Sequence, residues 1–357
     1  MLDAFRAIAI LAVVCFHYLY RWTPLREAAD SSGLGQGYAL FRLGTLGVEF
    51  FFIISGFVIY MTLEHCRSLP QFFLRRFARL YPAYLLTMLL VFAIGDQWGP
   101  PVFHHGWREL AAGLTMAAPH LHAAWIDGVY WSLLVEITFY FWAGLLFLLA
   151  RGRFESWWCT FALGASLLDH WLPGFADNWL IAHSLPFFTA GMYFYRRHVQ
   201  PARTAALLWW SALACYLLTW YWEEWRVHAA IAAMALAFVA MNRGWLNVLA
   251  WRPLLLIGEI SYSLYLLHEN IGITIIRQLR LRLQLPDLLA ALAAFAICVP
   301  LAWATVRLVE NPGKAWVSRI ANRRLLPWFD SHPWSARLAY PANRAYAPVA
   351  AMPPNAG

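Results

Sequence analysis

The sequence predicts an all-α protein that crosses a membrane about ten times, with both termini on the cytoplasmic side. Composition, a series of apolar runs and the placement of arginines each point to this class. Of the 357 residues, 61% are apolar and 13% are charged, against about 45–50% and 25% in soluble domains. Because water is a poor solvent for such a chain, we exclude a soluble enzyme, a disulfide-stapled secreted domain and a disordered protein.

Ten apolar runs are each expected to form one membrane helix. They cover residues 4–22, 45–63, 80–95, 129–150, 155–172, 179–195, 204–222, 228–242, 254–274 and 287–308. Apart from the third and eighth runs, whose ends are vague, each is long enough to cross a hydrocarbon core of roughly 30 Å at about 1.5 Å per residue. A shorter apolar stretch, residues 109–119, is expected to lie at the interface or to re-enter the membrane.

Basic residues set the predicted orientation. The chain has 27 basic and 19 acidic residues, scattered between apolar runs, so we expect the lipid bilayer as a partner and no nucleic acid. With the N-terminus inside, most loop arginines fall on the cytoplasmic side, as in known membrane proteins. The arginines of residues 277–282 are the exception. We therefore predict a multi-pass protein of the inner (plasma) membrane.

The domain organisation is expected to be simple. Residues 1–320 are predicted to form one integral-membrane domain. Residues 321–357, rich in proline, alanine and aromatic residues, are predicted to form a poorly ordered cytoplasmic tail. The five cysteines are isolated and odd in number, which favours packing roles over a disulfide framework or a metal site.

Ionisable side chains inside membrane helices are costly, so each is a candidate functional residue. In the first run, Arg6 and His17 lie about 16 Å apart along a helix and share one face. A histidine that only bonds one helix to another is the alternative. In the third run, Arg76 and Arg79 share a face at the membrane boundary, where they could hold phosphates bidentately. Ordinary cytoplasmic anchoring is the alternative there.

A polar stripe is expected on the fourth run, where Ser132, Glu136 and Tyr140 follow i, i+4, i+8 spacing. A carboxylate near mid-membrane needs a partner, and His17 or an arginine is the obvious one. The alternative is a purely structural pair of Glu136 with an arginine.

A further polar cluster is expected near the outer end of the ninth run. Tyr265 and His268 share a face there, with Glu269 just beyond, and they could line the route of an acceptor. An interfacial aromatic belt explains the tyrosine equally well. Glu49 and Glu310 are additional candidates.

Several segments follow one another in a characteristic order. The opening LDAFRAIAILAVVCFH is followed by GVEFFFIISGFVI, FLRRFARLYPAY, YWSLLVEITFYF, SYSLYLLH and VENP. This ordered set, which covers nearly the whole chain, resembles the acyltransferase-3 family of integral-membrane O-acyltransferases. The resemblance implies an enzyme that moves an acyl group, usually acetyl, from cytoplasmic acyl-CoA to a hydroxyl of a sugar or similar acceptor, without a metal.

The resemblance also implies roles for particular residues. The family's Arg-x10-His element falls on Arg6 and His17, its RxxR element on Arg76 and Arg79, and its intramembrane acid on Glu136. We expect His17 to act as base or acyl carrier, Glu136 to orient it, and the three arginines to bind acetyl-CoA.

Four other side chains are expected to bind substrate, and the pattern has gaps. The predicted substrate-binding residues are Ser132, Tyr140, Tyr265 and His268, and His268 is the second choice for the chemically active histidine. The second acid that family members often carry is Ile137 here, and the proline that often follows SLYLLH is missing from HENIG.

Two other functions remain open from sequence. Intramembrane Arg, His and Glu also mark substrate pathways, so the chain could be a transporter or flippase of lipid-linked sugars. Within the enzyme class, the acceptor could be a small molecule or a lipid instead of a cell-surface or exported glycan.

Overall fold

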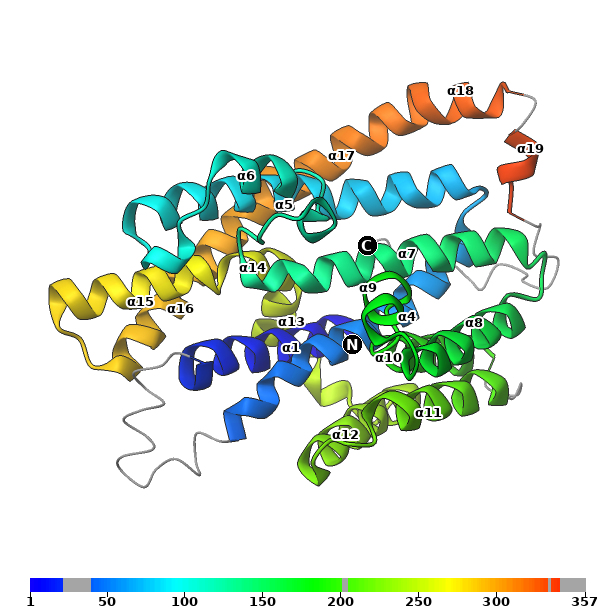
Figure 1. Ribbon diagram of the computed structural model, residues 1–357, viewed down its shortest axis with the longest axis horizontal. Helices are drawn as coiled ribbons and strands as arrows, with labels where there is room; N and C mark the ends of the chain where they lie inside the picture. The colour runs from blue at the N-terminus through cyan, green and yellow to red at the C-terminus, as the bar shows by residue number, and fades with distance from the viewer. Residues whose placement is uncertain (22–39, 201–204, 333–334, 341–357) are drawn as a thin grey trace.

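The computed structural model describes residues 1–21, 40–200, 205–332 and 335–340. Within these ranges every regular element is helical, and the one strand-like pairing is a bridge between Ser68 and Ala339. The predicted all-α class is confirmed. Figure 1 shows most of the long helices running roughly side by side along the longest axis of the molecule.

The longer helices form the body of the protein. They are α1 (Leu2–Phe16), α4 (Gly47–His65), α5 (Leu69–Trp98), α7 (Trp131–Leu149), α8 (Phe154–Asp169), α10 (Leu185–Val199), α11 (Ala206–Trp220), α12 (Trp225–Asn242), α15 (Asn270–Leu283) and α16 (Asp287–Thr305). Shorter helices are α6 (Trp107–Gly113), α9 (Pro173–Leu180), α13 (Arg252–Glu259), α14 (Ser261–Leu267), α17 (Asn311–Ile320), α18 (Leu326–Asp330) and α19 (Ser335–Leu338). Short segments of other helical types are η1 (His17–Arg21), η2 (Leu40–Leu46), η3 (Pro101–Phe103), η4 (Ala118–Leu121), η5 (Gly128–Tyr130), η6 (Asn247–Leu249), η7 (Val306–Glu310) and η8 (Ala321–Leu325).

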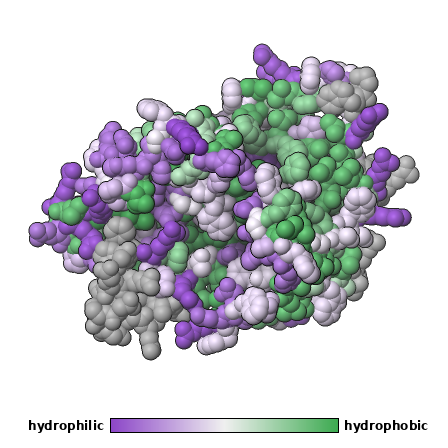
Figure 2. Space-filling model, viewed as in Figure 1, coloured by the Kyte–Doolittle hydropathy of each residue, from purple (hydrophilic) through white to green (hydrophobic). Residues whose placement is uncertain are grey.

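Six helical stretches in the described part of the chain are long and apolar enough to cross a membrane. They are Leu2–Arg21, Phe41–His65, Leu69–Trp98, Gly128–Leu149, Trp225–Asn242 and Asp287–Asp330. Figure 2 shows hydrophilic residues gathered toward the end that carries α15 and apolar residues gathered over the opposite half of the visible face. The protein is therefore a helical membrane protein, while the count of about ten spans and the cytoplasmic termini stay predictions.

The ninth predicted helix, residues 254–274, is divided in the structure. The chain forms α13, α14 and α15 in succession, with breaks at Ile260 and at His268–Glu269. Non-helical backbone at membrane depth occurs where it is buried in protein or lines a cavity. The second break places two ionisable residues of the sequence at the centre of the polar cluster described below.

Two other predicted segments differ at their ends. Helix α5 begins at Leu69, well before the predicted residue 80, because the Ser68 hydroxyl accepts a hydrogen bond from the Gln71 N–H and caps it. The helix continues through Pro82. The predicted segment 179–195 is interrupted: its first two residues end α9, and α10 begins at Leu185 after a short turn.

The predicted tail is partly helical. η8 and α18 continue from α17 beyond residue 320, and α19 follows. Tyr340 is buried against the ring of Phe147 at 4.9 Å between centroids, and its N–H donates to the Arg67 carbonyl at 2.9 Å. Residues 341–357, which the same prediction includes, lie outside the described residues.

Glycines allow the central helices to approach closely. A Cβ on Gly191 of α10 would lie 2.0 Å from the Ile53 carbonyl oxygen of α4, and a Cβ on Gly258 of α13 would lie 1.9 Å from the Asp3 carbonyl oxygen of α1. Small residues at such crossings are typical of membrane helix packing. A Cβ on Gly47 of α4 would lie 2.5 Å from the Ala9 carbonyl oxygen of α1. Helix α1 therefore packs against both α4 and α13; it carries Arg6 and leads directly into η1, which begins at His17.

Candidate active site

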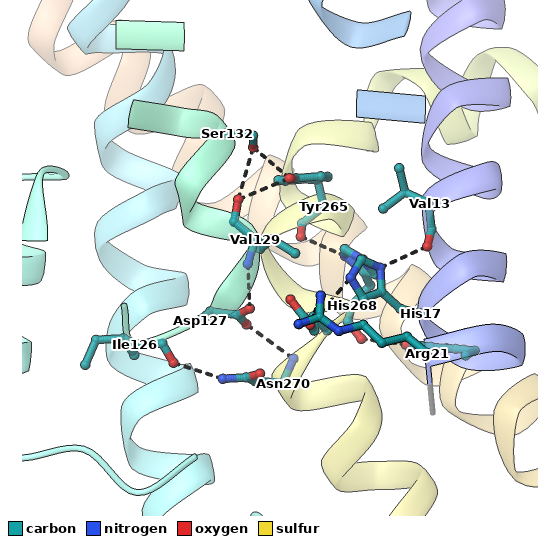
Figure 3. A network of polar contacts seen from close by, with 12 residues as sticks. Val13, His17, Arg21, Ile126, Asp127, Val129, Ser132, Tyr265, His268 and Asn270 are labelled. Atoms are coloured by element: carbon teal, nitrogen blue, oxygen red, sulfur yellow. Dashed lines mark hydrogen bonds and ion pairs between the residues drawn. The ribbon is translucent and has the colours of Figure 1, made fainter. Parts of the chain in front are cut away.

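The imidazole of His17 is buried among polar groups at the end of α1. Its side chain lies on η1 and the residue is 6% exposed. The Nδ1 atom is 3.0 Å from the Val13 carbonyl oxygen and 3.1 Å from His268 Nε2, and the Nε2 atom is 3.4 Å from Glu269 Oε1. The His17 and His268 rings meet edge to face, with their centroids 4.9 Å apart (Figure 3). The ring is therefore turned toward the protein and away from lipid.

The hydrogen-bond partners determine where the protons sit on the two rings. His268 Nδ1 is 2.8 Å from the Tyr265 carbonyl oxygen, which can only accept, so this nitrogen carries the proton and His268 Nε2 has a lone pair. His17 Nδ1 faces that lone pair and the Val13 carbonyl, so it carries a proton too. His17 Nε2 is left with its lone pair free to take a proton.

Glu269 is the carboxylate beside this nitrogen. It is 4% exposed, and its Oε1 lies between His17 Nε2 and Arg21 Nη1, which is 3.3 Å away. Its Oε2 is buried and has no hydrogen-bond partner in the described part of the chain. A carboxylate in this position stabilises a protonated imidazole. From sequence, Glu269 is expected only to lie just beyond His268, with no role of its own.

Asp127 holds the break between α14 and α15 in place. Its carboxylate, 0% exposed, accepts hydrogen bonds from the N–H groups of Val129 and Asn270, both at 3.2 Å. Asn270 Nδ2 also donates to the Ile126 carbonyl at 2.9 Å (Figure 3). The sequence prediction did not include Asp127. The available signal was the Asp127–Gly128 pair directly before the fourth apolar run. A Cβ on Gly128 would lie 2.9 Å from Glu269 Oε2, so this glycine makes room for the carboxylate.

The polar stripe of α7 runs from this cluster toward a second one. At one end the Ser132 hydroxyl is 2.6 Å from the Tyr265 hydroxyl, which also donates to the Val129 carbonyl at 3.1 Å. Further along, Glu136 accepts hydrogen bonds from Ser55 at 3.1 Å and from the Tyr140 hydroxyl.

The expected pairing of Glu136 with His17 is not found among the described contacts. The imidazole meets Glu269 instead, because the helix break brings that carboxylate to it. Glu136 interacts electrostatically with Arg6 and Arg76, so it belongs to the arginine cluster.

The three predicted phosphate-binding arginines come together near Glu136. Arg6 pairs with Asp3 at 2.7 Å and interacts with the charge of Arg79. Arg76 donates to the Thr62 hydroxyl at 3.2 Å, lies 5.9 Å from the ring centroid of Tyr140, and interacts with the charge of Arg79. Arg76 Nε is buried with no partner in the described part of the chain.

Helices α1 and α7 each reach both clusters. Helix α1 carries Arg6 and continues into η1, which carries His17. Helix α7 carries Tyr140 beside the arginines and Ser132 beside Tyr265. The two clusters are thus separated by about 16 Å along α1, the rise of eleven helical residues. Among the described residues no group of His, Cys, Asp and Glu side chains is arranged to hold a metal ion.

A buried imidazole–carboxylate pair and a basic cluster within one helical bundle define an integral-membrane protein with an enzyme-like site. The chain belongs to the acyltransferase-3 family: the family profile, described as an acyltransferase domain, matches residues 1–307. The resemblance inferred from the motifs is confirmed.

Two named relatives are similar over shorter stretches. Acyltransferase MdmB of Streptomyces mycarofaciens is 32% identical over 143 residues, which are 37% of this chain and 37% of the relative. Peptidoglycan O-acetyltransferase OatA of Listeria monocytogenes serovar 1/2a is 29% identical over 96 residues, 25% of this chain and 12% of the relative. The aligned stretches thus span well under half of each relative's length. No solved structure matches the chain.

Proposed function

We propose that this protein is a membrane O-acyltransferase that moves an acyl group, acetyl in the simplest case, from acyl-CoA to a hydroxyl of a cell-surface or exported glycan. The observation that carries the proposal is the buried contact of His17 Nε2 with Glu269 Oε1 at 3.4 Å, on the helical segment that also carries Arg6. Family membership supports the acyl chemistry. The name of the relative OatA, a peptidoglycan O-acetyltransferase, supports a glycan acceptor.

In this proposal, His17 Nε2 takes the proton of the acceptor hydroxyl while the hydroxyl oxygen attacks the thioester carbonyl carbon. The carbon–sulfur bond breaks, and the leaving thiolate receives the proton back from the imidazolium, so that the ester and the free thiol are the products. Glu269 stabilises the imidazolium between these two events, because its Oε1 faces Nε2 at 3.4 Å. Glu136 then acts on the donor side, beside the arginines.

The residues around the imidazole divide into two groups. His268 is 0% exposed and bonds His17 Nδ1, so we assign it to orienting the base, a change from its expected contact with substrate. Ser132 and Tyr265 form a hydroxyl pair near the same cluster, where they are placed to bind the acceptor. Tyr140 lies under Arg76, on the donor side.

The basic cluster fits a polyanionic donor. Arg76 Nε is buried and has no hydrogen-bond partner among the described residues, and guanidinium groups bind phosphate oxygens through paired hydrogen bonds. Arg6, Arg76 and Arg79 would hold the phosphates of acyl-CoA, and the pantetheine arm would extend along α1 toward His17. We place the protein in the plasma membrane with both termini in the cytoplasm, so that the basic cluster faces the compartment that supplies acyl-CoA.

Transfer of radiolabelled acetyl from acetyl-CoA tests the function. Purified protein in nanodiscs is expected to label a glycan acceptor, and His17→Ala is expected to abolish labelling while the protein stays folded. The control is His65→Ala, since the His65 Nδ1 also lies near the carbonyl four residues earlier, at 2.7 Å, but the residue is exposed and away from the cluster. Labelling that survives His17→Ala would remove the catalytic assignment.

The same assay separates the alternatives. A transporter or flippase of lipid-linked sugars would show no exchange of label with acetyl-CoA. An acyltransferase for a small molecule or a lipid would use acetyl-CoA, but deletion of its gene would leave surface-glycan acetylation unchanged.

A further inference from the structure

We infer that Lys314 of α17 completes the basic cluster of Arg6, Arg76 and Arg79, and that this four-cation site takes the phosphate-bearing nucleotide part of the thioester donor. The inference deepens the proposed function and rests on it. Lys314 is the single lysine of the chain, and it lies on an element that contributed nothing to the site predicted from sequence.

The position of Lys314 is set by close packing of α17 on α5. A Cβ on Gly313 would lie 2.5 Å from the Pro82 Cβ and 2.9 Å from its Cγ. Pro82 comes one helical turn after Arg79, so the glycine allows α17 to touch α5 at the level of the arginines. The Lys314 ammonium interacts electrostatically with Arg79, Glu310, Arg76 and Arg6.

The acids nearby are already engaged. Asp3 pairs with Arg6, Glu136 accepts from Ser55 and Tyr140, and Glu310, itself buried, accepts from the Ser263 hydroxyl at 2.9 Å. In the described part of the chain, neither Arg79 nor the half-buried Lys314 forms a hydrogen bond or ion pair through its side chain.

Four cations from three helices therefore meet where solvent is limited, and among the described residues only Arg6 of the four forms an ion pair, with Asp3. Like charges brought out of water repel one another and are costly without a counter-charge. A ligand with several negative charges relieves that repulsion. The unpartnered Arg76 Nε offers it a further donor, and a lysine ammonium supplies a point charge to phosphate where arginine supplies a planar fork.

A diphosphate with a further phosphate, as in the nucleotide part of CoA, matches this arrangement. The headgroup of an anionic lipid carries the same phosphate chemistry, so the test must separate the two sources. Acetyl-pantetheine has the same thioester without the nucleotide, so it shows whether an effect on the donor depends on the nucleotide part.

The test uses Lys314→Met in the full chain in nanodiscs, with Arg319→Met as the control, since Arg319 lies exposed on the same helix. We expect Lys314→Met to weaken equilibrium binding of CoA and to raise the KM for acetyl-CoA by roughly tenfold, the effect of one charged contact to phosphate. Turnover of acetyl-pantetheine should not change, and Arg319→Met should match the wild type. Lys314→Arg, which keeps the charge, should recover most of the CoA affinity and covers the case in which the methionine variant does not fold.

Unchanged CoA binding by folded Lys314→Met would overturn the inference, and so would an equal loss with both donors. If Lys314→Met lost CoA binding only in nanodiscs that contain anionic lipid, the site would be assigned to a lipid headgroup. That result would also overturn the inference. Because binding of CoA is measured without turnover, this test of the nucleotide site is independent of the test of the proposed transferase function. A wild-type protein that binds CoA through Lys314 but acetylates no acceptor would refute the transferase and leave the nucleotide site standing.

Discussion

The imidazole of His17 and the carboxylate of Glu269 meet at 3.4 Å, although one lies at the end of α1 and the other at the break between α14 and α15. The break is what brings them together. In a continuous helix over residues 254–274, the direction of the Glu269 side chain would be set by the helical rotation. The interrupted chain instead directs it toward His17 and Arg21. The pair depends on Asp127, which accepts the first N–H of α15.

Removal of the charge of Glu269 should slow catalysis. Glu269→Gln keeps the size of the side chain but leaves the protonated imidazole without its counter-charge, so kcat should fall by about 10- to 100-fold. The KM for acetyl-CoA should stay close to the wild-type value, because the arginine cluster is unchanged. Steady-state acetyl transfer measures both. A kcat equal to that of the wild type would exclude Glu269 from the mechanism.

Gly128 should tolerate no larger side chain. A Cβ there would lie 2.9 Å from Glu269 Oε2, so Gly128→Val should displace the carboxylate and lower kcat by roughly tenfold, the loss of about 1.4 kcal/mol of transition-state stabilisation. Gly164→Ala serves as the control, because no described atom outside its own helix backbone and chain neighbours lies within 4 Å of a Cβ at that position. Equal activity of the two variants would contradict the prediction.

Asp127→Asn should destabilise the protein as well as slow it. An amide oxygen can replace one of the two acceptors but its NH2 group cannot accept the other N–H, so one buried donor near Val129 or Asn270 loses its partner at a cost of about 1–3 kcal/mol. Thermal unfolding in detergent measures the change. The exposed Asp177, which accepts from the His183 N–H at 3.4 Å, provides the matched variant Asp177→Asn, whose stability should match the wild type.

The crossing of α4 and α10 should be sensitive to a single methyl group. Gly191→Ala would place a Cβ 2.0 Å from the Ile53 carbonyl oxygen, and the resulting overpacking should cost about 1–3 kcal/mol. Gly174→Ala is the control, since in the described part of the chain its Cβ would meet only its own helix backbone and chain neighbours within 4 Å. Unfolding temperatures measured side by side decide the outcome, and a stable Gly191→Ala variant would show that the two helices move apart without cost.

Hydropathy was enough to predict the helical class, and the ordered motifs were enough to predict the family. Local sequence could not reveal the break at His268–Glu269, because residues 254–274 read as one apolar run and the group that caps α15 is Asp127, far away in the chain. For the same reason Glu136 was assigned to His17. The family motif indicated Glu136 as the intramembrane acid, but it did not indicate that the break between α14 and α15 faces the imidazole.

The basic cluster was also predictable only in part from the sequence. The spacing of Arg6 and His17 and of Arg76 and Arg79 indicated shared faces on their own helices, which depends only on helical geometry. Lys314 could not be found in this way. Its position follows from the contact of Gly313 with Pro82, a tertiary fact with no periodic signal in either segment.

One continuous helix carries both Arg6 and His17, and a helix is stiff along its axis. The gap between the anchored end of a donor and the imidazole is thus a fixed length, and it acts as a gauge. If the proposed function holds, a donor with a shorter arm would place its thioester short of His17 Nε2, and a donor with a longer arm would place it beyond this nitrogen. The enzyme would select its donors by reach as well as by charge.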